Sequence, residues 1–127
     1  DSISNIKLSL SNYIIQIKFL HSLQRQKIQS TTMINVIVTY TVNPDYVSEN
    51  KSNIQKFLDD FKNLDQETFE YKVYVKEDGV TFLHYSNYIN EEVQHEVLNT
   101  PSFKEFQRLR DESGLNGTHK VEILQSI

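Results

Sequence analysis

The sequence predicts an α+β fold in which a four-stranded antiparallel sheet carries helices on one face. Three observations carry that prediction. The segments follow the order strand, helix, strand, strand, helix, strand over residues 33–127, the hydrophobic period changes between helical and extended at their boundaries, and turn residues separate them. The chain has 127 residues, 38% hydrophobic and 24% charged, which is the size and composition of one globular domain.

Residues 1–32 differ in composition from the rest and are expected to be an extension of uncertain structure before a domain at 33–127. The extension has no Gly, no Pro and no acidic residue after Asp1. A secretory signal has little support beyond a short apolar run. An amphipathic helix, which could serve as a membrane or partner anchor, is possible because apolar residues recur at spacings of three and four: Ile6, Leu10, Tyr13, Ile14, Ile17 and Leu20. A strand through Ile15, Ile17 and Phe19 is a further alternative. We favour the simplest one, in which Met33 is the functional start and the domain folds without the extension.

The first strand and the first helix follow directly after Met33. Residues 34–42 are a near-continuous run of β-branched and aromatic residues, which is typical of a central strand. Asn43, Pro44 and Asp45 end that strand. Residues 45–64 then place apolar side chains on one helical stripe and charged side chains opposite, so this helix is expected to bury one side.

A β-hairpin is predicted next. Residues 69–75 alternate between apolar and polar side chains, which indicates a strand with one covered face. Glu77, Asp78 and Gly79 supply the turn, and residues 81–89 form the second arm.

The second helical region is predicted in two pieces, and a last strand follows it. The first piece covers residues 91–98. Thr100 offers a hydroxyl for an N-cap and Pro101 a first helical residue, so a new helix is expected to start there and run toward Gly114. After the turn at Asn116 and Gly117, residues 119–127 are expected to form the last strand.

This order is the ferredoxin-like βαββαβ arrangement, with both helical regions on one face of the sheet. The opposite face would carry five apolar residues, an area too large to leave in water: Ile37, Leu83, Tyr85, Ile89 and Leu124. Burying even ~600 Å² of apolar surface per subunit would gain roughly 15 kcal/mol before the costs of association. We therefore expect a homodimer in which two sheets pack together as a dimeric α+β barrel.

Composition excludes several classes of partner and chemistry. Residues 33–127 hold nine Lys and Arg against sixteen Asp and Glu, with no basic stripe, so nucleic-acid binding is disfavoured. No apolar stretch reaches the ~18 residues of a membrane span, and no membrane partner is expected. The chain has no cysteine, which excludes thiol chemistry and favours a cytoplasmic location. The three glycines, Gly79, Gly114 and Gly117, form no Gly-rich phosphate-binding loop, so no cofactor is expected.

The step between the last hairpin strand and the second helical region carries a family resemblance. Tyr88 ends a strand, Glu91 and Glu92 open the helix, and Pro101 and Phe103 restart it fifteen residues after the aromatic. In this spacing residues 33–127 resemble the antibiotic-biosynthesis-monooxygenase-like family of the dimeric α+β barrel superfamily. The resemblance implies a pocket between sheet and helices and cofactor-free oxygenation of aromatic or polycyclic substrates.

The same alignment shows where the chain departs from that family. The family's strand-end aromatic, usually Trp, falls on Tyr88, and the helix histidine that recurs nine residues later falls on Val97. Tyr40 and Thr41 stand where the first strand of the family has Asn. A haem-degrading site built from Asn, Trp and His is therefore not expected.

Four histidines are candidates for chemistry: His21, His84, His95 and His119. They lie far apart, without the spacing of a zinc or iron site, and no metal is expected. His95 and Glu91 could chelate a metal across one helical turn, but a solvent-facing pair is the simpler interpretation. His84 is the candidate catalytic base, because it shares a strand face with Tyr88 and an imidazole ordinarily titrates near neutral pH. The simpler alternative, which we favour, is a core histidine bonded to a neighbouring Tyr or carbonyl.

The leading functional hypothesis is a homodimer that binds a small aromatic or polycyclic molecule. His84 would generate a substrate anion that gives an electron to O₂, with Tyr40 and Tyr88 orienting the ring. Phe61 and Phe106 are candidate ligand contacts, although the helix-to-sheet core is their simpler role. The alternative is a non-catalytic ligand-binding or structural dimer. A cavity of a few hundred Å³ touching His84 would favour the enzyme, and a filled interior the structural protein.

Overall fold

The computed structural model describes residues 14–18 and 33–127. Residues 14–18 are helical, so the strand considered through Ile15 and Ile17 is not formed there. The other expectations for the extension lie outside the described residues. Met33–Ile127 forms a compact unit of its own. Within the ranges that the structure describes, no helix combines the length and the apolar character needed to cross a membrane.

The sheet has the predicted four antiparallel strands, in the order β2-β3-β1-β4. β1 (Ile34–Thr41) pairs with β3 (Thr81–Tyr88) on one side and with β4 (Lys120–Leu124) on the other. β2 (Phe69–Val75) pairs with the free side of β3 as the other arm of the hairpin. The register places His84 of β3 beside Val38 of β1, which in turn faces Val121 of β4. One row of side chains therefore crosses the sheet at the level of His84.

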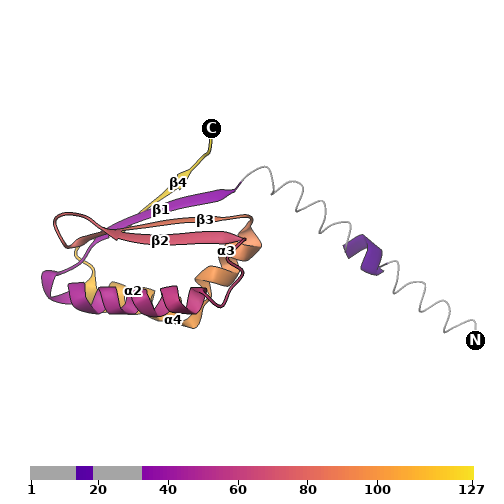
Figure 1. Cartoon of the computed structure of the whole chain (residues 1–127). Coiled ribbons are helices and arrows are strands. Elements are labelled where there is room, and N and C mark those ends of the chain that lie inside the picture. Colours follow the sequence, from indigo (N-terminus) through magenta and orange to yellow (C-terminus); the bar gives the residue numbers. More distant parts are fainter. Residues whose placement is uncertain (1–13, 19–32) are drawn as a thin grey trace, which may run out of the picture. The chain divides into compact units, whose positions relative to one another are not determined.

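The helices cover one face of this sheet, as Figure 1 shows. A 3₁₀ turn at Pro44–Tyr46 leads into α2 (Val47–Phe61), which packs beside α4 (Pro101–Leu109) under the strands. α3 (Glu91–Leu98) precedes α4 and contacts β3. The ferredoxin-like βαββαβ order predicted from the sequence is confirmed.

The helix boundaries differ from the prediction in their detail. Thr100 stands at the N-cap position of α4, but its hydroxyl makes no capping hydrogen bond, so that part of the prediction is wrong. Its carbonyl instead accepts from the N–H groups of Phe103 and Lys104. The side chain that caps a helix here is Asn90, whose Oδ1 accepts from the N–H of Val93 at 2.8 Å.

The last strand is shorter than the predicted residues 119–127. β4 pairs with β1 only, from Thr39 opposite Lys120 to Asn35 opposite Leu124. Since β1 itself begins at Ile34, residues 125–127 have almost no neighbouring strand with which to pair. The length of β4 is therefore set by its partner strand and not by the local sequence of the last segment.

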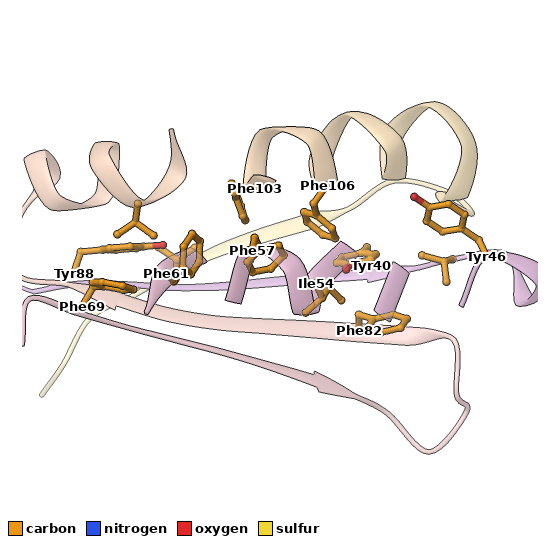
Figure 2. Close-up of a cluster of buried hydrophobic side chains, with 13 residues drawn as sticks. Tyr40, Tyr46, Ile54, Phe57, Phe61, Phe69, Phe82, Tyr88, Phe103 and Phe106 are labelled. Atoms are coloured by element: carbon orange, nitrogen blue, oxygen red, sulfur yellow. The ribbon is translucent and has the colours of Figure 1, made fainter. Parts of the chain in front are cut away.

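The core between sheet and helices is mainly aromatic, as Figure 2 shows. Phe57 of α2 lies at its centre, with ring centroids 5.0 to 5.5 Å from those of Phe61, Tyr71, Phe103 and Phe106. Tilted and edge-on ring pairs of this kind stabilise a core beyond the area that they bury. The four phenylalanines thus form the helix-to-sheet packing.

The opposite face of the sheet carries the predicted apolar residues. The register puts Ile37 beside Tyr85, and Leu83 and Leu124 on the same side of the strands, away from the helices. Ile89 lies just beyond the end of β3 and is exposed. Within residues 33–127 no layer covers this face, because α2, α3 and α4 lie on the other side of the sheet.

Candidate functional site

His84 lies in the middle of β3, is only 2% exposed, and has both ring nitrogens hydrogen-bonded to tyrosine hydroxyls. Its Nε2 is 2.7 Å from the hydroxyl of Tyr40 on β1, and its Nδ1 is 2.8 Å from the hydroxyl of Tyr71 on β2. Tyr40 and Tyr71 reach His84 from the two neighbouring strands because each stands two residues from the residue paired with it, Val38 and Val73. Sheet register therefore builds this arrangement.

Helix α2 adds a fourth polar side chain to the arrangement. Asn50 is fully buried, and its Nδ2 donates to the hydroxyl of Tyr40 at 3.1 Å. We call Asn50, Tyr40, His84 and Tyr71 the His84 network. In the arrangement that gives the Tyr40 O–H a partner within the network, Tyr40 accepts from Asn50 and donates to Nε2, and Nδ1 carries the ring proton and donates it to Tyr71. The O–H of Tyr71 is then left to donate to an acceptor outside the network.

Burial keeps the His84 network neutral. Desolvation, aided by the positive charge of Arg110, lowers the pKa of His84 to about 3, so the imidazole is uncharged at pH 7. Desolvation also raises the pKa of Tyr40, although the hydrogen bond from Asn50 and the charge of Arg110 oppose that rise. Burial raises the pKa of Tyr71 as well. Both hydroxyls therefore remain protonated at neutral pH.

A cavity of about 80 Å³ lies against this network, between the sheet and α4. Its lining combines apolar walls with nitrogen and hydroxyl groups, and consists of Val38, Tyr71, His84, Phe103, Phe106, Gln107, Arg110, His119 and Val121. His119 and Val121 are exposed, so the cavity meets solvent on the β4 side. The volume is below the roughly 300–1,000 Å³ of sites for drug-sized ligands. The cavity is thus smaller than the few hundred Å³ expected of an enzyme, although the interior is not filled as expected of a structural protein.

Arg110 places a positive charge at this cavity. It opens the π-helical turn Arg110–Gly114 that follows α4, and it is only 4% exposed. Its guanidinium carbon lies 4.9 Å from the ring centroid of Tyr40 and 5.3 Å from that of Phe106. Oδ1 of Asp111 accepts from its Nε and lies 2.9 Å from its Nη2. Turns of the π type are frequent at functional sites.

The structure brings three of the predicted site residues together. His84 and Phe106 line the cavity, and Tyr40 is bonded to His84 directly behind it. Tyr88 and Phe61 are buried and are not among the lining residues. Figure 2 shows them at one end of the aromatic core, with Tyr40 at the other.

Asn50 and Tyr71 of the His84 network, and Arg110 at the cavity, are not among the site residues predicted from the sequence. Tyr71 has the same alternation phase as Phe69 and Val73, which places it on the covered face of β2. Arg110 lies four residues after Phe106 and seven after Phe103, on the apolar stripe of α4. An arginine on an apolar stripe is the signal that points to it.

No metal site is built from residues 14–18 and 33–127, where no three His, Cys, Asp or Glu side chains come together. His95 is exposed on α3, and its Nδ1 accepts a hydrogen bond from Nδ2 of Asn99 at 3.1 Å. Of the other histidines that the structure describes, His119 lies at the cavity mouth and His95 is not among the lining residues.

Comparison with known proteins identifies solved structures that have a similar fold. No family model matches the sequence, and no curated protein is similar to it at a significant level. Among solved structures, a conserved protein from Methanosarcina mazei Go1 has a TM-score of 0.66 and 19% identity over 80% of this chain and 99% of that chain. A proposed antibiotic biosynthesis monooxygenase from Caulobacter crescentus CB15 has a TM-score of 0.65 and 18% identity, over 76% and 91%.

A further antibiotic biosynthesis monooxygenase has a TM-score of 0.65 and 10% identity, over 74% of this chain and 98% of that chain. These neighbours are matched over nearly their whole length, and the matched part of this chain has the extent of the domain. At such identities the likeness is one of fold. The chain has the ferredoxin-like fold of the antibiotic biosynthesis monooxygenases, as the resemblance at Tyr88 to Phe103 implies.

Proposed function

We propose that the chain is a small-molecule-binding protein that resembles cofactor-free monooxygenases and takes an aromatic ligand in the cavity beside His84. The observation that carries the proposal is the cavity itself, where a buried imidazole and a tyrosine hydroxyl meet apolar walls. A concave apolar space with a few convergent polar groups is the usual form of a small-molecule site. The likeness in fold to monooxygenases supports the same class of function.

In the catalytic form of the proposal, His84 removes a proton from the ligand through Tyr71. The substrate passes its proton to the Tyr71 oxygen while Tyr71 passes its own to Nδ1 of His84. The substrate carbanion gives one electron to O₂, and the two radicals combine in a carbon–oxygen bond. The resulting peroxide anion regains the proton and loses water, so that CH₂ and O₂ become C=O and H₂O. This sequence balances without a cofactor or an external reductant.

That reaction requires every hydrogen bond of the His84 network to reverse its donor and acceptor. Nδ1 accepts a proton only if Nε2 donates to Tyr40, and Tyr40 must then donate to the Asn50 amide oxygen. Oδ1 of Asn50 is buried without a hydrogen-bond partner among the described residues, so a rotation of the amide supplies the acceptor. An anionic substrate beside the ring would also raise the pKa of His84 from about 3.

The second candidate function is ligand binding without catalysis. The direction of the hydrogen bond from Asn50 favours it, because Nδ1 then carries a proton and the free nitrogen lone pair faces Tyr40. The low pKa of His84 favours it as well, since such a ring is a weak base at neutral pH. In this form the cavity recognises its ligand and leaves it unchanged.

One experiment tests the proposal and separates its two forms. Single-ring phenols and enolisable ketones are screened against the full chain by thermal shift, and the compounds that bind are assayed for O₂ consumption. Catalysis predicts turnover that falls at least about a hundredfold in His84→Gln and is kept in His95→Gln, an exposed control. Binding without turnover supports the second form, and no binding by any probe contradicts both.

We also propose that two copies pair through the uncovered face of the sheet. The side-by-side position of Ile37 and Tyr85, with Leu83 and Leu124 on the same face, supports this proposal. Tyr is enriched at protein interfaces, and an apolar patch of this kind favours burial. We further propose a cytoplasmic location, which the absence of cysteine favours.

A further inference from the structure

We infer that the cavity beside His84 takes a small organic anion, a carboxylate or phenolate on a single ring, whose charged oxygen accepts hydrogen bonds from Arg110 and Tyr71. The inference rests on the proposed function and narrows its ligand class. Three independent features of the lining carry it: its charge, its hydrogen-bond donors and its volume.

The lining carries positive charge and no negative charge. None of its nine residues is acidic, and Arg110 is a permanent cation that is almost fully buried. The only carboxylate bonded to Arg110 among the described residues is Asp111, which is 51% exposed at its side chain and engages the guanidinium through one oxygen. The Tyr40 and Phe106 rings also contact the guanidinium but carry no net charge, so an anion in the adjoining space would be favourable.

The polar groups of the lining are mainly hydrogen-bond donors. In the arrangement in which Asn50 donates to Tyr40, each member of the His84 network donates to the next, so the O–H of Tyr71 is left for the cavity. Arg110 has only N–H groups to offer. A carboxylate or phenolate oxygen, which only accepts, is the ligand group that complements donors of this kind.

The dimensions and walls of the cavity set the size of the ligand. A space of about 80 Å³ is too small for a fused polycycle, although its opening beside Val121 leaves room for part of a ring to reach toward solvent. Val38, Phe103 and Phe106 supply apolar walls for that ring. The structure thereby narrows the ligand from aromatic or polycyclic to a single ring.

The test compares two probes of nearly the same shape and different charge. Benzoate and benzamide are titrated into the full chain by calorimetry at pH 7, with 2-naphthoate as a larger acid. We expect benzoate to bind at least about tenfold more tightly than benzamide, because only the carboxylate offers two acceptor oxygens and a charge. We also expect 2-naphthoate to bind more weakly than benzoate.

Variants assign the charge recognition to Arg110 and Tyr71. Arg110→Met is expected to abolish the preference for benzoate over benzamide, and Arg110→Lys to keep part of it. Tyr71→Phe is expected to weaken benzoate binding by about tenfold. Arg108→Met is the matched control, because Arg108 lies on the exposed side of α4 in ion pairs with Glu105 and Glu112.

The outcomes separate this inference from the proposed function. Equal affinity for benzoate and benzamide would overturn the inference and leave a neutral-ligand site. A preference for benzoate that persists in Arg110→Met would overturn the role of Arg110. If that variant does not fold, the comparison of probes on the unmodified chain still decides. Failure of all three probes and of neutral phenols to bind would overturn both the inference and the proposed function.

Discussion

The hydroxyl of Tyr40 lies 2.7 Å from Nε2 of His84 while it also receives a hydrogen bond from Asn50. A single oxygen on β1 therefore joins a helix side chain to the imidazole on β3. Both bonds are buried, where an unpaired polar group costs much more than a hydrogen bond gains. The geometry of the site and the stability of the fold thus depend on the same atom.

Removing that oxygen should destabilise the protein. Tyr40→Phe leaves Nε2 of His84 and Nδ2 of Asn50 buried without their partner, at a cost of about 2–4 kcal/mol. Urea unfolding followed by circular dichroism measures the loss. Tyr74→Phe, on the exposed side of β2, is the matched control and should be near neutral. A loss in Tyr40→Phe no larger than in the control would contradict the account.

Acid should destabilise the fold through His84. The pKa of His84 is about 3 in the fold and about 6.5 in the unfolded chain, so below pH 6.5 the unfolded chain binds the extra proton. The contribution of His84 to the free energy of unfolding is fully present above pH 6.5. It is lost as the pH falls below that value, by up to about 1.4 kcal/mol per pH unit. His84→Gln should flatten this slope between pH 6.5 and 4.5 in urea titrations. If the wild-type protein and His84→Gln have the same slope, His84 is not held in its neutral form in the folded protein.

The contact between Gly114 and Tyr46 predicts an intolerance to side chains. A Cβ at Gly114 would overlap the ring of Tyr46, which is itself buried. Gly114→Ala should therefore lower the free energy of unfolding by about 1–3 kcal/mol. Combining it with Tyr46→Leu should recover part of that loss, and a chemical denaturation cycle measures the coupling. Two strictly additive effects would contradict the contact.

The uncovered sheet face predicts a dimer that charge will disrupt. Leu83→Lys and Tyr85→Glu place charges among apolar neighbours, so each should shift the protein from dimer to monomer in light scattering after size exclusion. Lys56→Glu, on the exposed side of α2, should leave the mass unchanged. A wild-type protein that runs as a monomer at micromolar concentration would refute the pairing.

Much of the fold could be predicted from the sequence because local patterns decide it. The alternation in β3 sets the phase of Phe82, His84, Ser86 and Tyr88, and these are the residues that the structure buries under the helices. The apolar stripe of residues 45–64 sets the buried side of α2 in the same way. The patterns also put Ile37 and Tyr85 on the opposite face, where the register has them.

The site itself depends on relations that no local pattern contains. Tyr71 meets His84 only because the hairpin pairs Val73 with His84, which fixes the diagonal neighbour. The apolar stripe of α4 indicates that Arg110 is buried, but only the packing of that region against the sheet brings its guanidinium over the Tyr40 ring. The hydroxyl of Thr100 leaves its predicted cap unmade, and Asn90 makes one. Tertiary packing decides the positions of Tyr71 and Arg110, whereas the cap that Asn90 makes is a local contact with Val93.

The most direct test of the site is the state of the His84 imidazole, observed by ¹⁵N NMR with His84→Gln for assignment. We expect both ring nitrogens to keep the chemical shifts of a neutral ring from pH 8 to 4.5, and to move when a single-ring aromatic ligand is added. An imidazole that titrates near pH 6.5 and does not respond to any ligand that binds would contradict this expectation.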